Sequence, residues 1–226
     1  MRGLAFAGAL SALVAVAGAP AQAAYLFDEN GDSADIVFDG FSGNSANTIP
    51  GLSASLRLTL LSGAQTRGYL FSYVLQNTST AGGSQSRVSG FAFNSTPDVR
   101  LVSTLGEFSN VILDGRYPNG IGDVEICLTG SNSCQGGGGL GATRGDPASG
   151  VFFLGFDRSQ RSVTLSDFFV RYQSLSGLNR VTSASGQEVT TAVPEPGTWL
   201  MMIFGLGAIG FAMRQRSRTT TRLRYT

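Results

Sequence analysis

Carboxylates are the main side chains in this chain that could do chemistry. The 226 residues include 15 Asp and Glu but no His and no Lys, so all 16 basic residues are Arg. The absence of His excludes Ser-His-Asp and Cys-His catalysis and His-based zinc sites, because those sites depend on an imidazole. Any catalysis or metal binding by this chain would therefore depend on its acidic residues.

Seven acidic residues in the middle of the chain are candidates for a glycoside-hydrolase pair. They are Asp98, Glu107, Asp114, Asp123, Glu125, Asp157 and Asp167. Such chemistry needs two carboxylates at a defined separation, and the spacing of these residues along the chain selects no pair. Scattered acids at this density are typical of a solvated surface. We therefore expect no catalytic residue and no enzyme activity, with a carboxylate-dependent hydrolase as the least favoured alternative.

The segment from Asp28 to Asp39 has part of the spacing of a calcium loop. Asp28, Asn30 and Asp32 follow a D-x-N-x-D pattern, and Asp39 lies where a twelve-residue loop has its last ligand. However, the sixth position is Ser33 instead of Gly, the twelfth is Asp instead of Glu, and no helical pattern flanks the segment. We expect a solvated acidic turn and no cofactor, with calcium binding as the alternative.

The elements that would position these side chains are predicted to be strands. Short apolar runs alternate with turn residues between positions 24 and 192, and no stretch keeps a 3.6-residue period for three turns. The predicted strands are Ile36–Phe38, Ser55–Leu61, Tyr69–Gln76, Val88–Phe93, Val99–Ser103, Val111–Leu113, Val124–Leu128, Val151–Phe156, Ser162–Leu165 and Phe168–Gln173. About ten strands in some 170 residues predict an all-β sandwich or jelly-roll-like domain.

The N-terminal residues have the pattern of a secretory signal peptide. Arg2 precedes a run of small and apolar residues from Leu4 to Ala19, and Ala21 and Ala23 fit the small-x-small cleavage rule. We predict cleavage after Ala23 and export through the Sec route. The alternative is a retained N-terminal anchor.

Cys127 and Cys134 are the only cysteines, and six residues separate them. An even pair close together in an exported chain predicts a structural disulfide. A redox or metal-binding role would need C-x-x-C spacing, further ligands or a partner His. We therefore predict a disulfide and no metal site, with free thiols as the alternative.

The distribution of charge argues against nucleic-acid binding. Residues 24–193 contain 14 acidic residues and 10 Arg, whereas five Arg lie in the last 13 residues of the sequence. A nucleic-acid-binding domain is expected to carry a basic excess on its folded part. Here the part predicted to fold is mildly acidic, so no nucleic-acid partner is expected.

The C-terminal residues combine a short motif, an apolar run and an Arg cluster. Pro194, Glu195 and Pro196 precede Trp199, and residues 198–213 are apolar apart from Thr198. The Arg cluster follows directly and consists of Arg214, Arg216 and Arg218. Sixteen helical residues span about 24 Å, slightly less than a hydrocarbon core, so we predict a short transmembrane helix over 198–213. The positive-inside rule places the Arg cluster in the cytoplasm.

This arrangement resembles the PEP-CTERM sorting signal, in its PEPxxWA variant. Leu200 stands where that variant usually has Ala, and the tail after Arg218 is longer than usual. The run R-V-S-G-F-A-F-N in the middle of the chain is similar in style to cargo of this family and of its cistern subgroup. The resemblance implies that an exosortase-type membrane protease recognises Pro194, Glu195 and Pro196 and cuts nearby, often in bacteria that make exopolysaccharide.

The sequence thus predicts a signal peptide (1–23), an exported β-rich domain (24–192), a sorting signal (193–218) and a tail (219–226). The expected function is that of a structural or interaction protein of the envelope or extracellular matrix, with the exosortase, the membrane and exopolysaccharide as partners. It would pass through a single-pass inner-membrane intermediate and end in the envelope or outside the cell. The alternative is a carbohydrate- or calcium-binding module.

Overall fold

The computed structural model describes residues 23–83, 85–189 and 196–216, which form a β domain and a separate helix. The strands of the β domain are β1 (Ala24–Phe27), β2 (Ser33–Phe41), β3 (Thr48–Ser62), β4 (Gly68–Asn77), β5 (Arg87–Thr96), β6 (Leu101–Gly106), β7 (Asn110–Tyr117), β8 (Gly122–Thr129), β9 (Ala142–Thr143), β10 (Ala148–Gly155), β11 (Val163–Gln173) and β12 (Ala184–Glu188). The helix is α1 (Pro196–Arg216).

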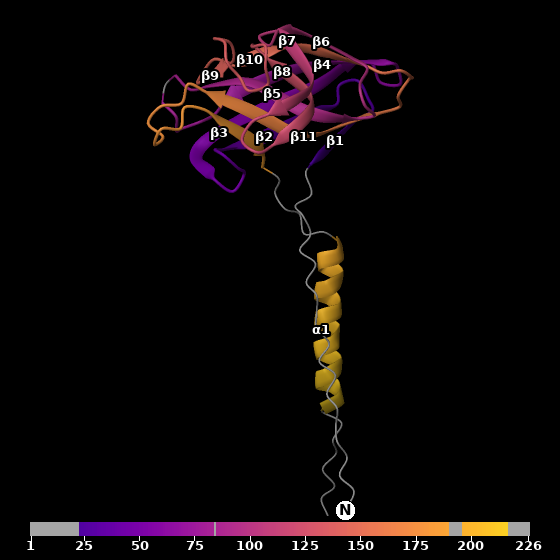
Figure 1. The fold of residues 1–226 in the computed structure, drawn as a ribbon. Coiled ribbons are helices and arrows are strands. Elements are labelled where there is room, and N and C mark those ends of the chain that lie inside the picture. Colours follow the sequence, from indigo (N-terminus) through magenta and orange to yellow (C-terminus); the bar gives the residue numbers. More distant parts are fainter. Residues whose placement is uncertain (1–22, 84, 190–195, 217–226) are drawn as a thin grey trace, which may run out of the picture. The chain divides into compact units, whose positions relative to one another are not determined.

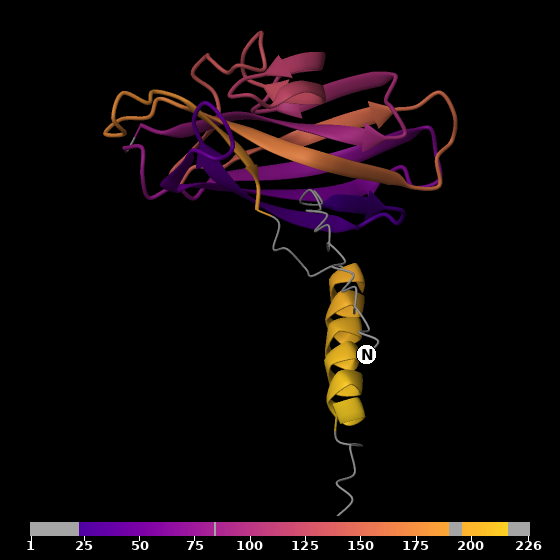
Figure 2. The same ribbon diagram turned by 60° about the horizontal axis from the view of Figure 1, so that its bottom comes forward.

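All strand pairs are antiparallel and belong to one curled sheet. The strand order is β6-β10-β4-β3-β2-β12-β11-β5-β8-β7, with β1 paired to β11 and β9 paired to β5. Figures 1 and 2 show that the sheet folds over into two facing layers, so that β4 and β10 lie opposite β5 and β11. The described residues between 23 and 189 therefore form the sandwich-like all-β domain that the sequence predicted.

Aromatic rings from both layers form the core between them. The rings of Phe91 and Phe93 on β5 lie 6.3 and 5.4 Å from that of Phe152 on β10, and Phe71 on β4 lies 5.1 Å from the same ring. These side chains are fully buried. Burial of one Phe side chain contributes about 1.5–3 kcal/mol, which explains why so Phe-rich a chain can stabilise a single core.

The alternation of apolar and polar residues sets which face of each strand is buried. On β2 the side chains of Ile36 and Phe38 are buried, while Val37 between them and Asp35 and Asp39 on either side are exposed. The same period of two holds for the three leucines of L-R-L-T-L on β3, all of which are buried. Period-two burial is what a strand with one core-facing side requires.

The structure corrects the strand assignments at several places. The two strands predicted at Ser162–Leu165 and Phe168–Gln173 are one strand, β11. Asp167 interrupts its regular geometry with a positive φ of 54°, but β11 pairs with β5 on both sides of this irregularity. The sequence did not predict β1, β9 or β12. Strand β12 reads A-S-G-Q-E and has no large apolar residue, yet it lies between β2 and β11.

Candidate functional site

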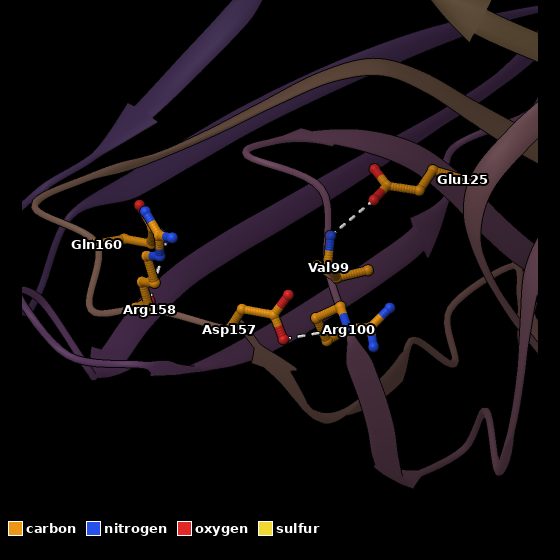
Figure 3. Close-up of polar contacts among 6 residues, drawn as sticks. All are labelled: Val99, Arg100, Glu125, Asp157, Arg158 and Gln160. Atoms are coloured by element: carbon orange, nitrogen blue, oxygen red, sulfur yellow. Dashed lines mark hydrogen bonds and ion pairs between the residues drawn. The ribbon is translucent and has the colours of Figure 1, made fainter.

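One hollow of the β domain has a volume of about 700 Å³. It is lined by Asn94 and Ser95 of β5, by Asp98, Val99 and Arg100 before β6, by Leu113 and Asp114 of β7, by Asp123, Val124 and Glu125 of β8, and by Asp157 after β10. Figure 3 shows Glu125 and Asp157 on opposite sides of the Val99–Arg100 segment. Five of the seven acids singled out in the middle of the sequence thus meet at one place, whereas Glu107 and Asp167 lie elsewhere.

Glu125 is a fully engaged hydrogen-bond acceptor. Its Oε2 accepts the backbone N–H of Ser95 at 2.6 Å and the Ser95 hydroxyl at 3.0 Å, and its Oε1 accepts the N–H of Val99 at 2.9 Å. The segment that it holds contains the cis Thr96-Pro97 peptide bond. Through these three accepted bonds Glu125 fixes the β5–β6 connection.

The single Arg of the hollow is paired with one of its acids. Arg100 Nε lies 3.1 Å from Asp157 Oδ1, and both side chains are more than 70% exposed. An ion pair at that exposure contributes about 0–1 kcal/mol, so it shapes the rim more than it stabilises the fold. Since Asp98, Asp114 and Asp123 add three further carboxylates, the hollow has an excess of negative charge. Such a surface can accept hydrogen bonds from hydroxyl groups or attract cations.

The four calcium candidates do not converge in the structure. Asp32 Oδ2 accepts the N–H groups of Asp28 and Glu29, both at 2.9 Å, and these bonds hold the pKa of Asp32 below its usual value. Asn30 Oδ1 accepts the N–H of Ala64. Asp39 lies seven residues further along β2, about 23 Å from Asp32 at the rise of an extended strand. Within 23–83, 85–189 and 196–216, no three His, Cys, Asp or Glu side chains are grouped so as to hold a metal ion.

Cys127 and Cys134 form a disulfide, with their Cα atoms 6.0 Å apart. Both cysteines belong to a small second cluster with Ala92, Tyr117 and Val124, on the side of β5 and β8 that faces away from the main core. The disulfide closes the turn after β8. Its buried position is that of a structural crosslink.

The C-terminal segment forms helix α1 from Pro196 to Arg216, so the predicted helix over 198–213 is confirmed as a helix and is five residues longer. Trp199, Arg214 and Arg216 lie on it, whereas Pro194, Glu195 and Arg218 lie outside the described residues, as does Ala21. Ala23 directly precedes β1. Six large apolar side chains of α1 are 60–71% exposed: Met202, Ile203, Phe204, Leu206, Ile209 and Met213.

A search of the described residues for membrane spans finds no helix with enough length and apolar character to cross a bilayer. The helical prediction for this segment is thus confirmed, while its membrane crossing stays a prediction.

Residues 192–217 match the family model of the PEP-CTERM protein-sorting motif. No curated protein and no solved structure matches the chain. The match covers the C-terminal segment alone and says nothing about the β domain. It confirms the resemblance drawn from Pro194, Glu195, Pro196 and the residues after them, without testing the PEPxxWA variant or the cistern subgroup.

Proposed function

Because residues 192–217 form a PEP-CTERM sorting motif, which marks substrates of exosortase-type sorting systems, we propose that this chain is exported cargo of such a system. In this proposal a signal peptide is removed after Ala23 and the β domain is delivered across the inner membrane. An exosortase-type protease then cuts near Pro194–Pro196. The domain acts in the envelope or the extracellular matrix as a structural or interaction protein, in association with exopolysaccharide, and has no catalytic role.

Helix α1 supports the membrane stage of the proposal. Six of its large apolar side chains between Met202 and Met213 are exposed, and exposed apolar surface of this kind is stabilised by an apolar environment. Arg214 and Arg216 follow at its C-terminal end, where positive charge favours the cytoplasmic side. The apolar run is short, so we propose a weakly held intermediate that is suited to release.

The acid-lined hollow favours a second candidate, a binding role for the β domain. Asp98, Asp114 and Asp123 surround an open space large enough for a sugar unit or a hydrated cation. Calorimetric titration with exopolysaccharide fragments and with calcium would test this candidate. Loss of the heat signal in the Asp114→Asn/Asp123→Asn variant would support the hollow as the site, and an unchanged signal would place binding elsewhere.

A hydrolase is the third and weakest candidate, because Glu125 is held as an acceptor by Ser95 and Val99. Turnover of a glycan substrate would support the hydrolase candidate if replacing a single acidic residue of the hollow abolished that turnover.

The proposed processing can be tested by intact mass of the protein from membrane and medium fractions. The wild-type protein should start at Ala24 and end near Pro194–Pro196, and the Pro194→Ala and Glu195→Ala variants should keep the C-terminal residues. Pro147→Ala, which changes an exposed loop proline, is the matched control and should be processed normally. A species that runs to Thr226 in all variants and stays in the membrane would contradict the proposal.

A further inference from the structure

Strands β1 and β12 lie end to end along the same edge of β11. Residues Ala24–Phe27 of β1 pair with Ser166–Val163 of β11, while β12 pairs with its other half, Phe169 being opposite Gln187. Strand β5 pairs with both halves of β11 and therefore occupies its opposite edge. The two short strands consequently share the remaining edge, both running antiparallel to β11.

This register brings the first residue of β1 next to the last residue of β12. Ala24 is opposite Ser166, and Glu188, one residue beyond Gln187, is level with Phe168. Two positions along a strand correspond to about 7 Å, a gap that a Glu side chain can bridge. The point where the polypeptide enters the β domain therefore adjoins the point where it leaves.

Glu188 has an unsatisfied carboxylate oxygen at this junction. Tyr25 donates its hydroxyl hydrogen bond to Glu188 Oε1, whereas Oε2 is buried and has no hydrogen-bond partner among the described residues. A buried oxygen without a partner is costly, and a negatively charged one more so. One more hydrogen-bond donor at this junction would therefore satisfy Glu188 Oε2.

The negative charge around Glu188 favours a cation as this donor. Asp167 on β11 adds a second negative charge, and its Oδ2 accepts bonds from Asn94 and Ser166. Burial first, and the charge of Asp167 to a smaller extent, raise the pKa of Glu188 above its usual value. Strand β2 contributes the uncharged Phe38 opposite Glu188. The described ion pairs are Arg57–Asp35 and Arg100–Asp157, so neither places an Arg at the junction.

We propose that the α-ammonium group of Ala24, created by removal of the signal peptide, forms an ion pair with Glu188. The inference rests on the proposed cleavage after Ala23. In that step water adds hydroxide to the Ala23 carbonyl carbon, and the broken peptide bond leaves an amine on Ala24, which takes up a proton at neutral pH. The precursor has an amide nitrogen there and no charge. Processing therefore supplies the cation that the junction lacks and locks β1 against the end of β12.

The chain offers an unusually selective probe of this ion pair, because it contains no Lys. The α-amine of the processed protein is its only primary amine, so an acetylating succinimidyl ester reports on that group alone. Only the neutral amine reacts, and pairing with a carboxylate keeps the amine protonated to higher pH. Intact mass gives the acetylation rate of the full processed protein purified from the membrane fraction, in buffer and in urea.

We expect acetylation at pH 7.5 to be about tenfold slower in the folded protein than in urea, which corresponds to a pKa about one unit higher. Glu188→Gln keeps the side-chain volume and should abolish most of the difference. Glu29→Gln, which changes an exposed carboxylate in the β1–β2 turn, is the matched control and should retain it. The pH dependence of the acetylation rate of the wild-type protein, measured in buffer and in urea, gives the difference in pKa of the α-amine without any variant.

The outcomes separate this inference from the proposed function. A protein that starts at Ala24 but reacts at equal rates in buffer and in urea would overturn the ion pair and leave the processing intact. A protein that starts at another residue would overturn the cleavage site and the ion pair together.

Discussion

Replacement of Glu125 tests whether the hollow is built around a structural carboxylate. The side chain accepts three hydrogen bonds from Ser95 and Val99, at 2.6, 3.0 and 2.9 Å. At about 1 kcal/mol net for each bond, a value suited to a partly buried site that water can enter, Glu125→Ala should lower the free energy of unfolding by about 3 kcal/mol. Glu125→Gln keeps one acceptor oxygen and should lose about half of that.

Urea denaturation monitored by far-UV circular dichroism would measure the change in the free energy of unfolding. The dependence of this free energy on urea concentration would be checked for two-state behaviour. Asp123→Asn is the matched control, because Asp123 lines the same hollow and a surface substitution of this kind should change stability by less than about 0.5 kcal/mol. If Glu125→Ala were as stable as Asp123→Asn, the carboxylate would not hold the β5–β6 connection. Its assignment as a structural group would then be wrong.

Three further predictions follow from other parts of the β domain. Replacing Cys127 and Cys134 with Ser should lower the free energy of unfolding by about 2.5 kcal/mol, which is the loop-closure entropy of an eight-residue ring. In the same urea titration, the reduced wild-type protein should have the same free energy of unfolding as the variant. Tyr25→Phe removes the hydroxyl that stabilises ionised Glu188. It should lower the free energy of unfolding by about 1 kcal/mol at pH 7 and by less at pH 4, because Glu188 takes up a proton at the lower pH. An equal effect at both pH values would contradict this role. The pKa of Asp32 is lowered in the folded state, so its contribution to stability is present above its pKa in the unfolded chain and is lost as the pH falls through its pKa in the folded protein. Carbon-detected NMR titration should find the pKa of Asp32 lower in the folded protein than in the urea-unfolded chain. An equal or higher value would refute the turn geometry.

The proposed ion pair at Ala24 would link the two proposed cleavages. The two segments that we propose to be cleaved off adjoin neighbouring points of the β domain, since Ala24 begins β1 and Glu188 ends β12. Strand β12 lies between β2 and β11, and the N–H of Val189 donates to Val37 O just beyond it. An ion pair across this junction would stabilise the last strand before the sorting motif only after the first cleavage has occurred.

Several elements could be predicted from sequence because local patterns determine them. The period-two burial of β2 and β3 follows from alternating residue types, and the disulfide follows from the proximity of Cys127 and Cys134 in the chain. The predicted bounds were too short for β3 and displaced for β6, which begins at Leu101. Strand ends depend on neighbouring strands, and a single sequence does not contain that information.

Strand β12 shows why a local pattern can fail completely. Its A-S-G-Q-E sequence contains no apolar alternation. A Cβ atom at Gly186 would lie 2.6 Å from Val170 Cγ2 and 2.8 Å from Tyr172 Cε2, so the large side chains of β11 fill the space that side chains of β12 would otherwise occupy. The strand is specified by its neighbours and not by its own residues.

By itself the sequence determined the all-β class, the Cys pair, the presence of a helix over 198–213 and the sorting motif, because each depends on residues close together in the chain. Only the tertiary structure decided that Asp114, Glu125 and Asp157 share one hollow, and that the start of β1 adjoins the end of β12. The hollow combines residues of β7 and β8 with a residue that follows β10. Ala24 and Glu188 are 164 positions apart, and the pairing of both β1 and β12 with β11 brings their strand ends together. Strand pairing at such distances depends on the whole pattern of burial, which no local segment of the chain contains.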